Sequence, residues 1–186
     1  MDEERRVAAA RHGDRDAFRP LVEAYARPLF ALCVRITRDA ALAEDAVQEA
    51  LFNAYRHLRD FDGRSSFKTW LYRIAVNAAL EQMRKQDRHR VEVADDTDDE
   101  DNTLAEQHAA ESPGPEAHAH GGEIASRVDA ELARMTLLER TAFTLRHAEG
   151  CSIEDIATAL SMNSSACKQA IFRAVRKLRH ALQGIR

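Results

Sequence analysis

Basic, aromatic and amide side chains alternate between residues 61 and 77, a mixture whose chemistry is non-covalent binding. Single-stranded nucleic acid suits such a surface, because rings stack on or enclose the bases while cations neutralise the phosphates. Helical spacing places Phe67 and Trp70 on an apolar stripe, so we expect both to belong to the core. Tyr72, Arg73 and Asn77, with the loop at residues 60–66, are the better candidates for contact.

A second candidate surface is the acidic face of residues 41–59. Apolar residues recur in this segment at i, i+3, i+4 and i+7, which predicts one buried helix stripe. The opposite face carries Asp45, Gln48, Glu49 and Phe52. Exposed acids often serve only solubility. A large aromatic residue among them favours a docking surface for another protein.

The carboxy-terminal third has the pattern of a helix-turn-helix. A short apolar helix capped by Ser152, a turn at residues 161–163 and a longer basic helix capped by Asn163 or Ser164 follow one another. The second helix of such a unit can enter the major groove of DNA. The docked arrangement places Ser164, Ser165, Lys168 and Gln169 at the bases. It places Arg173, Arg176, Lys177 and Arg179 mostly at phosphates or a partner. A plain helical hairpin with a solvated basic face is the alternative.

No pattern in the chain indicates an enzyme or a cofactor. The sequence has no phosphate-cradling glycine loop, no HExxH and no Ser/His/Asp set whose adjacency can be argued. His118 and His120 are too few for a metal site. Cys33, Cys151 and Cys167 are far apart and odd in number, which fits small apolar residues in a reducing compartment. We therefore expect no catalytic residue, metal or cofactor.

Helices must position all of these residues. Apolar periodicity predicts helices over residues 14–37, 41–59 and 67 to about 85, and again from 124 onward. Pro20 and Pro28 suit helix starts or a break in the first of these. Ser65 or Ser66 is the expected cap before Phe67. The predicted fold class is all-α, as two small helical domains joined by an acidic flexible linker.

The charge distribution supports that division. Residues 1–90 hold 17 Lys and Arg against 14 Asp and Glu, residues 91–123 hold none against 11, and residues 124–186 hold 10 against 6. The acidic stretch has too little apolar surface to order itself, so it reads as a spacer or as an electrostatic decoy for basic surfaces. The predicted domains are residues 1–88 and 124–186, with the linker at 89–123. Without an apolar run or a secretory leader, the expected location is the cytoplasm, without membrane insertion.

The motifs together resemble a bacterial RNA polymerase sigma factor of the extracytoplasmic-function (ECF) group. Glu44-Asp45-Ala46-Val47-Gln48-Glu49 resembles the polymerase-binding region of that family. Residues 61–77 resemble its minus-ten region, and residues 152–176 its minus-thirty-five reader. Two motif blocks in this order, separated by a tether, are far more specific than a single helix-turn-helix.

The resemblance implies a sigma region 2-like bundle, a sigma region 4-like helix-turn-helix and three sets of contact residues. Asp45, Gln48, Glu49 and Phe52 would bind the beta-prime clamp helices of core RNA polymerase. The minus-ten DNA would meet Phe61, Arg64, Ser65, Phe67, Lys68, Tyr72, Arg73 and Asn77. The minus-thirty-five DNA would meet Ser164, Ser165, Lys168, Gln169, Phe172, Arg173 and Arg176. The beta flap and an anti-sigma factor are the remaining implied partners.

Two other functions fit the residues alone. A stand-alone helix-turn-helix regulator would bind palindromic duplex DNA without polymerase, at half-sites about one turn apart. A protein–protein adaptor would use the acidic helix and never read DNA. Because each cationic domain has few charges for phosphate contacts, we expect neither to bind a promoter tightly unless polymerase holds both.

Overall fold

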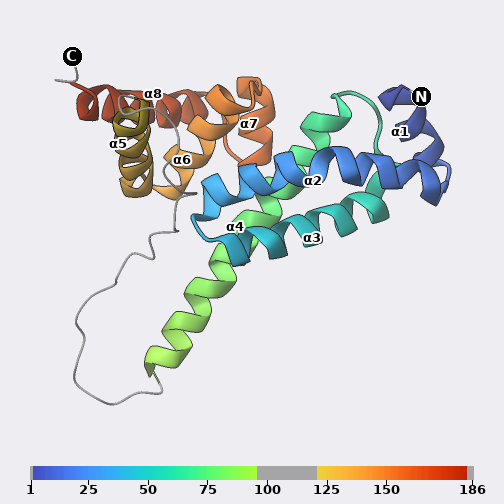
Figure 1. Ribbon diagram of the computed structural model, residues 1–186, viewed down its shortest axis with the longest axis horizontal. Coiled ribbons are helices and arrows are strands. Elements are labelled where there is room, and N and C mark those ends of the chain that lie inside the picture. The colour runs from blue at the N-terminus through green and yellow to red at the C-terminus, as the bar shows by residue number, and fades with distance from the viewer. Residues whose placement is uncertain (1, 96–120, 184–186) are drawn as a thin grey trace. The chain divides into compact units, whose positions relative to one another are not determined.

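The computed structural model describes residues 2–95 and 121–183 of the 186-residue chain. Within these residues every regular element is helical, which confirms the predicted all-α class (Figure 1). The helices form two compact units, one containing α1–α4 and the other α5–α8. Most of the predicted linker, residues 96–120, lies outside the described residues, together with His118 and His120.

The first unit is a bundle of α1 (Glu3–Arg11), α2 (Arg15–Thr37), α3 (Ala40–His57) and α4 (Phe67–Asp95). In Figure 1, α2 and α3 run alongside each other as a hairpin, and α4 crosses both. Most of the stripe predicted on α3 is buried, since Ala43, Ala46, Ala50 and Ala54 have no exposed surface. The prediction is wrong for Tyr55, which is 39% exposed. Small alanine side chains allow the neighbouring helices to approach closely, and the leucines of α2 fill the space between them.

Helix α2 is continuous through both prolines, so the expectation of a helix start or break there is wrong. A proline has no amide proton, so Pro20 and Pro28 leave the carbonyl groups of Asp16 and Ala24 without helical partners. Both of those residues are exposed, where water solvates the carbonyls. The burial of the apolar stripe of α2 against α3 and α4 offsets the lost hydrogen bonds.

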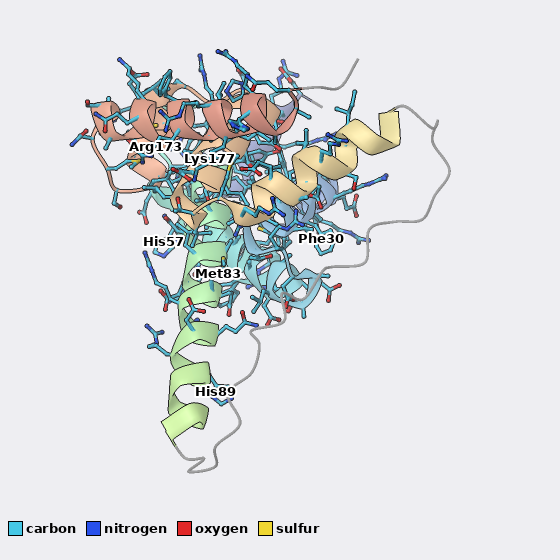
Figure 2. The ribbon with its side chains drawn as sticks, turned by 90° about the vertical axis from the view of Figure 1, so that its left-hand side faces the viewer. Phe30, His57, Met83, His89, Arg173 and Lys177 are labelled. Atoms are coloured by element: carbon cyan, nitrogen blue, oxygen red, sulfur yellow. The ribbon has the colours of Figure 1, made fainter. Side chains whose placement is uncertain are left out.

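Helix α4 runs ten residues further than the predicted end at Lys85 and enters the segment assigned to the linker. Residues 84–92 are mostly good helix formers, which explains the extension. Glu81 also supports this part of the helix, because its carboxylate pairs with Arg84 at 3.7 Å and with Arg88 at 3.3 Å. His89 marks this stretch of α4 in Figure 2.

The second unit consists of α5 (Gly121–Arg134), α6 (Leu137–Phe143), a π-helical turn (Thr144–Ala148), α7 (Ile153–Ala159) and α8 (Ser164–Ala181). Met135, Ala174 and Leu178 form a core cluster, with Val128, Leu132 and Phe143 packed against it. Helix α5 begins at Gly121, although the two glycines at 121 and 122 were expected in the linker.

The predicted helix-turn-helix is present as α7 and α8. The Ser152 hydroxyl accepts a hydrogen bond from the Asp155 amide at 3.0 Å and so caps α7. The side chain of Asn163, one of the two predicted caps, accepts from the Ala166 amide at 2.8 Å and starts α8. Between the helices, Ser161 adopts a positive φ of 52°, which makes the turn tight.

Candidate functional site

The exposed face of α3 is the first candidate surface. Asp45 and Gln48 are exposed, and 60% of Phe52 is open to solvent. The guanidinium carbon of Arg56 lies 5.4 Å from the centre of the Phe52 ring, so one turn of helix presents a cation–π pair. An aromatic ring left open among polar side chains has the chemistry of a protein-docking surface.

Glu49 differs from its predicted companions, because its half-buried carboxylate is bound to side chains of the same unit. It accepts a hydrogen bond from Gln82 Nε2 at 2.8 Å and lies 3.8 Å from Lys85 Nζ, both on α4. The sequence pattern placed Glu49 on the exposed face of α3 but could not show a partner 33 residues away. Glu49 therefore ties α3 to α4 while Asp45, Gln48 and Phe52 remain outward.

An aromatic cluster lies beneath the loop that joins α3 to α4. The rings of Phe61, Phe67 and Trp70 have centroids 5.2 to 6.1 Å apart, and Tyr25 of α2 packs edge-on against Phe67 at 5.6 Å. Phe67 and Trp70 are buried, as predicted for core residues. Phe61 is also buried, at 6% exposure, so its ring supports the loop from below.

The expectation that Tyr72 lies on the open face of α4 is wrong, since only 3% of the residue is exposed. The reason is that α4 packs against both α2 and α3, so it buries a wider stripe than a helix with one neighbour. Lys68 lies over the Tyr72 ring, with Nζ 5.0 Å from the ring centre. Of the predicted contacts on α4, Asn77 is exposed and Lys68 and Arg73 are half-buried.

The loop itself is shaped by Asp62, Gly63 and Arg64. The Asp62 carboxylate accepts from the Arg64 amide at 3.0 Å and pairs with Arg64 Nε at 2.7 Å. The backbone hydrogen bond from Arg64, with the Arg64 charge, lowers the pKa of Asp62 although partial burial opposes it. Gly63 has a φ of +76°, which a residue with a Cβ rarely adopts. The predicted cap is Ser66, whose hydroxyl accepts from the Thr69 amide at 3.0 Å.

The amino-terminal half of α8 is the second candidate surface. Ser164, Ser165, Lys168 and Gln169 are exposed, as is Arg176 further along. Phe172, which the family resemblance implies as a contact with minus-thirty-five DNA, is 65% exposed. Lys168, Gln169, Phe172 and Arg173 line a shallow concavity on this face. Donors, an open ring and a cation thus lie together on the helix that a major groove would receive.

Arg173 and Lys177 are both bound to Glu139 of α6. Arg173 Nε donates to one carboxylate oxygen at 2.9 Å, and Lys177 Nζ donates to the other at 2.6 Å. Figure 2 shows these two side chains on neighbouring turns of α8. Sequence reasoning missed Glu139. Its spacing from Thr136 reads as a capping box, which the structure contains, but nothing local points to partners on α8.

Glu139 is an ionised carboxylate in a buried position, with its side chain 5% exposed. Burial raises its pKa, but the hydrogen bonds from Lys177 and Arg173 and from the Thr136 amide lower it to about 2. A buried carboxylate with two cationic partners joins α6 to α8, because these partners on α8 compensate the charge that burial removes from water.

A groove between α5 and α8 gathers further positive charge. It is lined by Arg127, Arg134, Arg176, Lys177 and His180 against one acid, Glu131, with Ala130 and Ala181 between them. The lining residues come from two segments about 50 positions apart, so their meeting could not be deduced from either segment alone. Lys177 is already paired with Glu139, so the arginines give this groove the chemistry to bind phosphates or an acidic surface.

Residues 2–95 and 121–183 contain neither a candidate membrane span nor a candidate metal cluster. No helix there is long and apolar enough to cross a bilayer. The same residues contain no group of three or more His, Cys, Asp or Glu side chains placed to hold a metal ion.

Segments of both helical units match regions of one protein family. Residues 21–89 match sigma-70 region 2, and residues 125–178 match sigma-70 region 4. RNA polymerase sigma-H factor of Pseudomonas aeruginosa is 38% identical over 95% of this chain and 92% of its own length. The ECF RNA polymerase sigma-E factor of Escherichia coli is 33% identical, covering 90% of this chain and 87% of its own.

The fold is similar to that of a sigma factor of known structure. The sigma factor RpoE from Bartonella quintana, crystallised in complex with the anti-sigma factor NepR, superposes with a TM-score of 0.67 at 25% identity. The match covers 91% of this chain and 98% of that one. The region 2 match lies within the first helical unit, and the region 4 match lies within the second.

Proposed function

The chain belongs to the sigma-70 family and is an ECF sigma factor, and on this premise we propose how its surfaces divide the work of promoter-specific initiation. A sigma factor binds core RNA polymerase and directs it to promoters. The single observation that carries the residue assignment is the placement of two open aromatic rings, Phe52 and Phe172, one on each matched region. The stand-alone regulator is not favoured, because region 2 has no role in such a protein.

The face of α3 is the polymerase-binding surface, with Phe52 as its anchor. Asp45 and Gln48 surround the ring with polar groups that would pair with the beta-prime clamp helices. A desolvated aromatic within a polar rim is the usual form of an interaction hot spot. Glu49 contributes by holding α3 on α4, since its carboxylate already has two partners in this unit.

The loop and the first turns of α4 contact the minus-ten DNA as a single strand. Arg64, Ser65, Lys68, Arg73 and Asn77 supply charge and hydrogen-bonding groups around the loop. Phe61, Phe67 and Tyr72 act from below, because their burial fixes the loop and the helix. A pre-formed surface of this kind can hold a base that has left the stack, whose extraction costs a few kcal/mol.

The second unit reads the minus-thirty-five duplex through α8. Ser164, Ser165, Lys168, Gln169 and Phe172 meet base edges. The open end of the Arg173 guanidinium joins them, because Arg173 lines the same concavity as Lys168, Gln169 and Phe172, and Arg176 lies toward the phosphates. The beta flap of polymerase is the partner we assign to this unit. We assign these functions to residues 1–88 and 124–186, joined through residues 89–123, although α4 continues to Asp95 and α5 begins at Gly121.

The protein acts without a catalytic site or cofactor, as a subunit of polymerase in the cytoplasm. We further assign its control to an anti-sigma factor that covers Phe52 and α8. The Bartonella quintana relative was crystallised with such an inhibitor, which supports this assignment. Burial of the two open rings would remove both surfaces from use.

Transcription reconstituted from core polymerase and the purified full chain tests the proposal. Promoter-specific transcript should appear only when both are present. Asp45→Lys with Phe52→Ala should abolish it by preventing polymerase binding, while Lys168→Ala with Gln169→Ala should abolish promoter choice but retain polymerase binding. Glu23→Lys, an exposed reversal on α2, is the matched control and should leave both intact.

Either of two results would contradict the proposal and favour another function. Tight binding of the full chain to palindromic duplex without polymerase would favour a stand-alone regulator. Unchanged promoter choice in the Lys168→Ala, Gln169→Ala variant, with normal polymerase binding, would favour an adaptor.

A further inference from the structure

Glu139 lies under the DNA-facing helix without belonging to the DNA-facing surface. The residue is 4% exposed, and its carboxylate joins α6 to two side chains of α8. Helix α8 carries five Lys and Arg residues, at positions 168, 173, 176, 177 and 179. Two of these five cations, Arg173 and Lys177, therefore have an internal counter-ion.

The two cations are held in different ways. Arg173 donates to Glu139 through Nε, so the two Nη groups at the end of the guanidinium are not used in this contact. Its side chain is 44% exposed, so this end can reach a ligand. Lys177 instead points its compact ammonium group at the carboxylate, at 2.6 Å. The contact orients one cation and neutralises the other.

The two effects change different properties of DNA binding, namely the affinity for any sequence and the discrimination between sequences. Every cation that meets a phosphate increases affinity for any sequence and steepens its salt dependence. Discrimination between sequences depends on donors fixed in a defined geometry at the base edges. A carboxylate that fixes an arginine and cancels a lysine would favour discrimination at the expense of general affinity.

We propose that Glu139 is a positioning residue that sets the sequence discrimination of α8, by fixing the Arg173 guanidinium and withholding Lys177 from the DNA phosphates. This inference rests on the proposed function, in which α8 reads the minus-thirty-five duplex. It adds a residue of α6 that contacts no DNA.

Glu139→Gln is the decisive variant. Glutamine keeps the size of the side chain and can still serve in the capping box with Thr136, so α6 should form normally. Without the negative charge, Arg173 loses its fixed orientation and Lys177 becomes available to phosphates. Holoenzyme is reconstituted from core polymerase and the full chain. Its affinity for the promoter fragment is compared with that for the same fragment scrambled at minus-thirty-five.

The variant holoenzyme should discriminate between the two fragments at least about five-fold less well than wild type, the lower end of one bidentate arginine contact. Its affinity for the scrambled fragment should depend more steeply on salt, with a log–log slope larger by about 0.9 for each cation gained. Unchanged discrimination and an unchanged slope would overturn the proposal.

Thr136→Ala is the matched control for a merely structural role. It removes the other half of the capping box but leaves the contacts of Glu139 with α8 in place. It should lower the melting temperature without changing the slope or the discrimination. If Thr136→Ala reproduces the effects of Glu139→Gln, then Glu139 acts only through helix stability and the proposal fails.

Lys177→Met gives an independent test that keeps Glu139 ionised and bonded to Arg173. Because Lys177 is already neutralised, its loss should leave both the salt slope and the discrimination unchanged. A slope shallower by about 0.9 would show that Lys177 meets a phosphate directly, and would overturn the inference.

If wild-type holoenzyme itself does not distinguish the two fragments, the proposed reading by α8 fails. If it does and Glu139→Gln behaves identically, only the role of Glu139 fails.

Discussion

The surface proposed for minus-ten DNA in the first unit and the surface proposed for minus-thirty-five DNA in the second unit are built in opposite ways. In the first, the aromatic residues are buried, and a shaped loop lies over them. In the second, Phe172 is open on the face of a single helix, and the buried group beneath is the charged Glu139. The loop of one surface rests on packed aromatic rings, whereas two cations of the other are held by a buried carboxylate.

The difference follows from what each surface is proposed to bind. A flipped base needs a rigid backbone frame around it, and packed rings provide such a frame because they resist deformation. A duplex groove needs side chains projecting from a regular helix, and their orientation must come from contacts at their base. Mutations at aromatic positions should therefore affect stability in the first unit and binding in the second.

Trp70→Ala should have the largest effect. The ring contacts both Phe61 and Phe67, so its removal leaves a cavity and should destabilise the first unit by about 3–5 kcal/mol. Chemical denaturation of the full chain, followed by circular dichroism, measures this loss. A variant as stable as wild type would show that the loop does not depend on the aromatic cluster.

Phe172→Ala should weaken DNA binding and leave the free energy of unfolding almost unchanged. Because the ring is exposed, unfolding should shift by less than about 0.5 kcal/mol. Holoenzyme affinity for the minus-thirty-five duplex should fall by about 2 kcal/mol, or roughly 30-fold, as for an interface anchor. The comparison between the two surfaces breaks down if the variant loses stability but binds normally.

The ion pairs of Glu139 should make stability depend on pH. Hydrogen bonds from Lys177 and Arg173 lower the pKa of this carboxyl to about 2 against the opposing effect of burial, so the folded state favours the ionised form. The resulting stabilisation, about 1–2 kcal/mol, is complete above the unfolded pKa near 4.3 and lost as pH falls through the folded value. Melting temperatures of wild type and Glu139→Gln should differ at pH 6 and converge near pH 2. A constant difference would place the stabilisation elsewhere.

Two cap substitutions should have the smallest effects and equal sizes. Ser66 caps α4 and Asn163 caps α8, each through one hydrogen bond to a backbone amide, so Ser66→Ala and Asn163→Ala should each cost about 1 kcal/mol. Denaturation of the two variants measures the costs. A much larger loss at Ser66 would indicate that the loop and its aromatic support respond as one unit.

The helices were predictable because their signals are local. The alanine stripe of α3, the caps at Ser152 and Asn163 and the turn before α8 all depend on neighbours within a few residues. Phe67 and Trp70 were correctly assigned to the core for the same reason. The end of α4 was placed too early, because composition marks where charge changes and not where a helix stops.

The parts of the site that escaped prediction depend on distant partners. Tyr72 is buried because two other helices cover α4, and no spacing within α4 reports how many neighbours it has. The contacts of Glu49 and Glu139 escaped prediction for the same reason, since each carboxylate binds side chains more than 30 residues away in the sequence. Charge patterns identified both candidate surfaces but could not separate side chains that face solvent from those already bound within the fold.

Helix α2 depends on its neighbours to exist at all. An internal proline costs an isolated helix about 3 kcal/mol, and this helix contains two. A peptide of residues 15–37 should therefore be a coil in water, and the segment becomes helical only when α3 and α4 cover it. Assembly of the first unit is then necessarily cooperative, because its central helix cannot form in advance of its surroundings.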